Sequence, residues 1–280
     1  MGGRFGDIWW LMDGPTLKLG RNGALTITGL VVVVVLAWVY LLAGAHIGVP
    51  MIGLGGDQST AISSQWSLGY AATVVIMWAA MMVAVMVPSA TKVVLLAATL
   101  DGQERSLFAL RSIAEFVAGY LVVWLGFGLV ATALQWALDE AGLLSAPLAT
   151  SDHILAGSLL LYAGVYQWTP LKQACLTHCR APQDFLARHW RQDGPFGTGL
   201  RHGLFCFGCC WMLMGLLFVG GIMNLMCIAA IAVVIVVEKT LPHGIWTGRV
   251  IGTTLVAAGT VAVASLDAWR LFLVEIAQLI

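Results

Sequence analysis

The chain has 280 residues, of which 60% are hydrophobic and only 10% charged, and its 14 basic residues balance its 14 acidic residues. Its mean hydropathy of +0.90 lies far above the range of water-soluble proteins. This composition excludes a soluble globular domain and predicts an integral membrane protein. The lipid bilayer is the expected surrounding, and no nucleic-acid partner is expected.

Long apolar segments recur along the chain. A bilayer core of about 30 Å requires roughly 20 mostly apolar residues, because each backbone N–H and C=O must be satisfied inside its helix. We therefore expect an all-α polytopic membrane protein, a bundle of about seven transmembrane helices. The expected spans are 24–45, 69–98, 112–137, 154–170, 201–220, 222–238 and 248–266.

The fifth and sixth spans are separated only by a turn at Gly220 and Gly221. One continuous span, which would leave six helices, is the alternative. We prefer two, because roughly 38 apolar residues exceed the length that one crossing requires.

Lys and Arg residues in short loops resist translocation and so indicate orientation. They precede the first expected span and follow the second, fourth and sixth, whereas the loops after the first, third and fifth spans contain none. The pattern predicts an N-in/C-out, multi-pass protein of the bacterial inner membrane. The expected organisation is a cytoplasmic or interfacial N-terminal segment at 1–23, the transmembrane bundle at 24–266 and a C-terminal segment at 267–280. A cytoplasmic loop is expected at 180–199.

Five of the six cysteines form two groups, and both groups are expected at the cytoplasmic side. Cys175 and Cys179 follow the fourth span and, in a helix, share one face with His178 beside them. The second group opens the fifth span and contains Cys206, Cys209 and Cys210. Because the cytoplasm keeps thiols reduced, these groups favour metal binding or redox chemistry over disulfides. The alternative is that the cysteines pack as small apolar residues.

Sulfur atoms continue beyond these groups. Cys206, Cys210 and Met214 recur every four residues, which predicts a sulfur stripe along one helix face. The further candidate ligands are Met81, Met82, Met86, Met223, Met226 and Cys227. Thiolates and thioethers together suit Cu(I), with zinc and mercury as alternatives. Taken alone, the methionines of the second span are better explained as core packing.

Two carboxylates fall inside the expected spans near their cytoplasmic ends, Glu115 and Glu238. Arg111, Lys172 and Lys239 are the expected partners. Ion pairing at the membrane interface is the simplest interpretation, although an intramembrane carboxylate is also a candidate for ion handling.

Several short motifs resemble a family of bacterial integral membrane proteins described as predicted metal-binding membrane proteins. The resemblance covers roughly residues 70 to 240. It is carried by Trp78, Met81, Met82 and Pro88; Tyr166, Gln167, Pro170, Lys172, Cys175, Cys179, Arg180 and Pro182; Gly208, Cys209, Cys210, Trp211 and Met214; Met223, Asn224 and Met226; and Glu238 with Lys239. It implies metal handling without identifying a substrate or a ligand set.

The leading hypothesis is that this membrane protein binds a soft metal ion, copper(I) above all, for transport, capture or delivery to a partner such as a metallochaperone. The alternative is a noncatalytic accessory subunit of a larger respiratory or photosynthetic membrane complex. No enzyme is expected, because the sequence contains no nucleophile with a paired base and no phosphate-binding or nucleotide motif.

Overall fold

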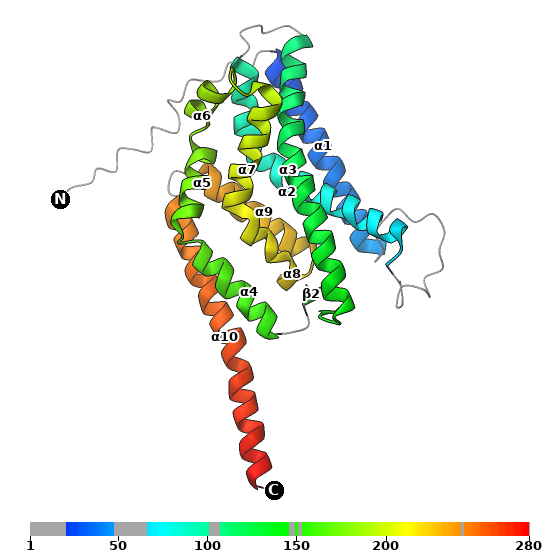
Figure 1. Ribbon diagram of the computed structural model, residues 1–280, viewed down its shortest axis with the longest axis vertical. Coiled ribbons are helices and arrows are strands. Elements are labelled where there is room, and N and C mark those ends of the chain that lie inside the picture. The colour runs from blue at the N-terminus through cyan, green and yellow to red at the C-terminus, as the bar shows by residue number, and fades with distance from the viewer. Residues whose placement is uncertain are drawn as a thin grey trace, which may run out of the picture.

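The computed structural model describes residues 21–47, 66–100, 107–145, 149–150, 153–241 and 244–279. These residues are almost entirely helical, which confirms the all-α prediction (Figure 1). The exception is a two-residue antiparallel pair, β1 (Leu144–Ser145) with β2 (Ala149–Thr150). Residues 1–20 of the predicted N-terminal segment lie outside the described residues.

Helices occupy all seven of the expected apolar segments. In chain order the helices of the described residues are α1 (Arg21–Ile47), α2 (Leu68–Leu100), α3 (Leu107–Glu140), α4 (His153–Tyr166), α5 (Pro170–Arg180), α6 (Pro182–His189), α7 (Gly194–Gly215), α8 (Leu217–Gly220), α9 (Leu225–Thr240) and α10 (Gly244–Leu279). Five of these segments are long and apolar enough to cross a membrane: α1, α2, α3, α7 with α8, and α10. The helices α4 and α9 are shorter, with 14 and 16 residues.

The turn predicted between the fifth and sixth spans is present. α8 ends at Gly220, Gly221 has a φ of 94°, and the Asn224 side chain caps α9 by accepting the N–H groups of Met226 and Cys227. The two segments then run antiparallel, because Gly220 lies against Cys227 at one end and Lys239 contacts Cys206 at the other. The alternative of one continuous span is therefore wrong.

The region after α4 differs from the predictions. The fourth span was expected to reach residue 170, but α4 ends at Tyr166, and a new helix starts where Thr169 caps it and Pro170 occupies the first turn. The expected cytoplasmic loop at 180–199 contains a helix of its own, α6. Gly194, with φ 68°, then begins α7.

Close helix pairs organise the bundle. α3 packs along α7, and α4 packs along α10. The α3–α7 contact depends on glycine: a Cβ at Gly199 would lie 2.0 Å from the carbonyl oxygen of Phe116, and one at Gly119 would lie 2.2 Å from that of Phe196. The C-terminal half of α10 extends beyond the other helices (Figure 1). The interior between α2, α3, α5, α7 and α9 contains the cysteines.

Candidate metal centre

Two helices, α5 and α7, position the cysteines. Cys175 and Cys179 lie on α5, and Cys206, Cys209 and Cys210 lie on α7. The two helices meet where Gly208 lacks a side chain, since a Cβ there would lie 2.6 Å from the Cys175 Sγ. The two cysteine groups predicted from the sequence therefore do come together.

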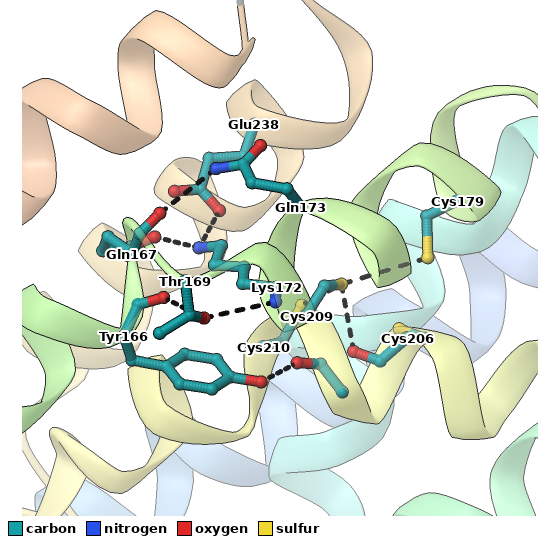
Figure 2. A network of polar contacts seen from close by, with 11 residues as sticks. Tyr166, Gln167, Thr169, Lys172, Gln173, Cys179, Cys206, Cys209, Cys210 and Glu238 are labelled. Carbon is teal, nitrogen blue, oxygen red and sulfur yellow. Dashed lines mark hydrogen bonds and ion pairs between the residues drawn. The ribbon is translucent and has the colours of Figure 1, made fainter.

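Four of the thiols form one buried group, which we call the thiol cluster: Cys179, Cys206, Cys209 and Cys210 (Figure 2). Cys209 is its centre. Its Sγ lies 3.9 Å from that of Cys179 and 3.2 Å from that of Cys210, and it donates a hydrogen bond to the Cys206 carbonyl oxygen at 3.1 Å. All six cysteines of the chain are free thiols.

The sulfur separations can be compared with those that a shared ion requires. Metal–thiolate bonds of about 2.3 Å place two sulfurs about 3.8 Å apart on a tetrahedral ion and about 4.0 Å apart on a trigonal one. The 3.9 Å between Cys179 and Cys209 meets this requirement, whereas the 3.2 Å between Cys209 and Cys210 is too short and would require one side chain to rotate. Cys179 and Cys209 are therefore the pair placed for one ion.

A buried cation borders the cluster. The Lys239 ammonium, on α9, donates to the Cys206 Sγ at 2.9 Å and to the Ser89 hydroxyl at 3.0 Å. The Tyr120 hydroxyl lies 3.1 Å from the same sulfur and 3.2 Å from the carbonyl oxygen of Met86. Cys206 is thus contacted by residues of α3 and α9, which α2 holds in turn, and the Lys239 ammonium offsets negative charge on the sulfur.

The thiols on α5 are shifted toward their protonated form. Burial raises the pKa of the Cys175 thiol. The pKa of the Cys179 thiol is raised well above its ordinary value, chiefly by its hydrogen bond with Cys206. A metal ion that binds either thiol must therefore displace a proton.

A second polar group lies beside the cluster. Lys172, on α5, forms a 2.7 Å ion pair with Glu238 and donates a further hydrogen bond to the Gln167 side chain (Figure 2). Both ions are at most 2% exposed, so the pair is buried in the bundle rather than placed at an interface. The other carboxylate predicted inside a span, Glu115, pairs with Arg111 at 2.9 Å on the surface.

The remaining predicted ligands are distributed over three places. Met81, Met82, Met86 and Met214 are fully buried in the core. His178 is exposed and lies outside the thiol cluster. Its ring stacks on Phe205 with centroids 4.2 Å apart. Met223 and Cys227 are half-buried and Met226 is 80% exposed, beyond the far end of α8 and roughly 20 Å along α7 and α8 from Cys206.

Sequence reasoning missed several residues of this site. Lys239 was considered only as a partner for a carboxylate, and Tyr120 and Ser89 were not considered. His202, one turn before Cys206 on α7, is 2% exposed, stacks on Tyr120, and has an Nδ1 without a hydrogen-bond partner. Its spacing of four residues from Cys206 was the signal that could have identified it.

Within the described residues, no group of three or more His, Cys, Asp or Glu side chains has the arrangement of a preformed metal site. Residues 75–262 match a protein family described as PpoB2, copper chaperone. The match covers about two thirds of the chain. The chain belongs to the PpoB2 copper chaperone family. No curated protein and no solved structure matches it.

The PpoB2 family match extends from α2 into α10. It includes every member of the thiol cluster, together with Lys239 and Tyr120. The resemblance to a metal-handling family is thereby confirmed as far as a copper-related family, and the family description agrees with the choice of copper, while the ligand set stays a prediction.

Proposed function

We propose that this protein is an integral membrane copper chaperone that holds one Cu(I) ion in the thiol cluster and delivers it to a partner. The observation that carries the proposal is the Cys179–Cys209 pair, whose 3.9 Å sulfur separation suits two thiolates on one soft ion. Copper is here the cargo. Cu(I) accepts two or three sulfur ligands, so it needs no further acidic or imidazole ligand.

Charge balance supports Cu(I) at this place. One Cu(I) and two thiolates have a net charge of −1, and burial of that charge in an apolar bundle is costly unless a counterion is present. The Lys239 ammonium beside Cys206 supplies the matching positive charge. The loaded cluster would then be neutral, which favours its retention inside the bundle.

The apolar exterior supports a membrane location. Large apolar side chains such as Val130, Val250 and Leu36 are 61–68% exposed, an arrangement that is costly in water and ordinary in lipid. We infer a multi-pass protein of the bacterial inner membrane in which α4 and α9 complete seven crossings, with the N-terminus and the thiol cluster toward the cytoplasm. Single cysteines introduced at Asp193 and Ser145 of a chain with Cys227 replaced by Ser test the orientation: a membrane-impermeant thiol reagent applied from outside should label only position 145.

Delivery fits this site better than conduction. The predicted outer ligands do not continue the thiol cluster, since Met226 faces outward and Met223 lies beyond α8. A buried thiol pair with a family assignment to copper chaperones supports capture followed by transfer. The partner is a copper-accepting protein whose thiolates compete for the ion.

The test is Cu(I) binding by the purified full chain in detergent, measured by competition with a chromophoric Cu(I) chelator under anaerobic conditions. We expect one tightly bound Cu(I) per chain and X-ray absorption spectra with sulfur ligands only. A chain that binds no Cu(I), or binds it through oxygen and nitrogen alone, would overturn the proposal.

A further inference from the structure

The thiol cluster has one side that approaches the protein surface. Cys206, Cys209 and Cys210 are at most 1% exposed, whereas Cys179 is 7% exposed. Its neighbour in the chain, His178, is exposed. The cluster therefore comes nearest to the surface at Cys179, on α5 beside His178.

A pocket opens at this position, between α5 and α6. It has a volume of about 240 Å³ and is lined by Thr177, His178, Ala181, Phe185, Arg188 and His189. The two histidines come from different helices and line the same pocket. One of them, His189, lies in the helix that the sequence did not predict.

The hydrogen bonds of both histidines define which nitrogen is available. The Nδ1 of His178 lies 2.8 Å from the carbonyl oxygen of Ala174, and that of His189 lies 2.9 Å from the carbonyl oxygen of Phe185. A carbonyl oxygen only accepts, so each Nδ1 holds the ring proton. In the neutral ring the Nε2 then has a free lone pair, which is the arrangement of metal-ligating histidines.

Both rings are also held in place by stacking. His178 stacks on Phe205 with centroids 4.2 Å apart, and His189 stacks on Phe185 with centroids 4.7 Å apart. Phe185 and Phe205 contact each other edge to face. Two imidazoles with fixed tautomers and orientations therefore share one pocket.

We propose that this pocket is a copper-loading site, separate from the thiol cluster, in which the Nε2 atoms of His178 and His189 accept Cu(I) and pass it to Cys179. The proposal rests on the proposed function, because the thiol cluster is the destination. Two imidazoles bind Cu(I) more weakly than thiolates do, so onward transfer is favourable. In the transfer the Cu–Nε2 bonds break, a Cu–Sγ bond forms at Cys179, the thiol proton moves to the released imidazole, and copper stays Cu(I).

The first experiment measures loading kinetics on the full chain, with Cu(I) supplied as its acetonitrile complex and followed by the ultraviolet absorbance of Cu(I)–thiolate bonds. The H178F/H189F variant keeps both stacked rings and removes all four nitrogens. We expect its loading rate to fall at least tenfold while the final Cu(I) stoichiometry stays at the parent value. The matched control, T177V, alters the same pocket without removing an imidazole and should load at the parent rate.

The second experiment observes the site directly in a variant in which all six cysteines are replaced by Ser, because any remaining thiolate would take Ag(I) from the histidines. One equivalent of Ag(I), a diamagnetic substitute for Cu(I), should shift the Nε2 resonances of His178 and His189 in nitrogen NMR spectra. Unshifted resonances, or parent-rate loading by H178F/H189F, would overturn the loading site. A lowered Cu(I) stoichiometry in H178F/H189F would overturn the claim that the loading site is separate from the thiol cluster. Resonance shifts produced by inorganic phosphate instead of Ag(I) would overturn the loading site and make the pocket an anion site. Full Cu(I) binding by C209S/C210S would overturn the proposed function instead.

Discussion

The Nζ of Lys239 lies 2.9 Å from the Sγ of Cys206 inside the helix bundle. Lys239 is 6% exposed and shares its other contact with the Ser89 hydroxyl, so no solvent screens the ammonium from the sulfur. A lysine at this depth is costly unless a negative charge compensates it. The Lys239 ammonium is therefore explained as the counterion of a thiolate or of a copper–thiolate unit.

The first prediction concerns that counterion. Replacing Lys239 with Met keeps the length of the side chain and removes its charge, and a hydrogen bond to a charged group contributes about 1.5–3 kcal/mol. We expect the affinity for Cu(I) to fall by roughly 10- to 100-fold, measured by chelator competition. The control is Lys92→Met, at an exposed lysine of α2, which should bind like the parent. Equal affinities in the two variants would show that Lys239 does not act on the metal.

The second prediction concerns the centre of the thiol cluster. Replacing both Cys209 and Cys210 with Ser keeps their size but removes soft ligands, so tight Cu(I) binding in the thiol cluster should be lost while helix content is retained. Cys227→Ser, beyond the far end of α8, should bind like the parent. Circular dichroism and Cu(I) stoichiometry together check the outcome. Parent-like binding by the double variant would mean that the cysteines only pack.

The sulfur stripe on α7 could be predicted because it depends on helical periodicity alone. A helix repeats every 3.6 residues, so Cys206, Cys210 and Met214 had to share a face. Apolar length likewise predicted the helical segments, since a bilayer sets their minimum. The burial of α7 residues depends on the close contact with α3 at glycines. The sequence contains these glycines but does not show which helix they contact.

The orientation of α5 could not be predicted, because its buried face contains a charge. Lys172, Leu176 and Cys179 form the buried stripe, at spacings of four and three residues. Hydropathy would place Lys172 outside. It lies inside because Glu238, 66 residues later in the chain, pairs with it, and this long-range pairing turns His178 toward the surface.

The third prediction tests this buried pair. Removing one partner leaves an uncompensated buried charge, which costs about 3–5 kcal/mol, whereas removing both replaces the pair by apolar packing. We therefore expect Lys172→Met or Glu238→Leu alone to lower the thermal unfolding midpoint in detergent strongly. The K172M/E238L double variant should recover most of the loss. A double variant as unstable as the sum of the two single variants would show that the residues do not interact.

The last prediction concerns the contact between α3 and α7. Gly199 allows that contact, because a Cβ at this position would lie 2.0 Å from the carbonyl oxygen of Phe116. A Cβ at Gly126, on α3, would meet no neighbouring atom within 4 Å, so Gly126 serves as the matched control.

Gly199→Ala must separate the two helices, and such overpacking costs about 1–3 kcal/mol. The same displacement moves Tyr120 on α3 away from Cys206 on α7, so Cu(I) affinity should fall together with the thermal unfolding midpoint. Gly126→Ala adds a methyl group in open space and should leave both quantities at or slightly above the parent values, since alanine favours the helix. A Gly199→Ala variant that unfolds earlier but binds Cu(I) with parent affinity would show that the thiol cluster does not depend on the register between α3 and α7.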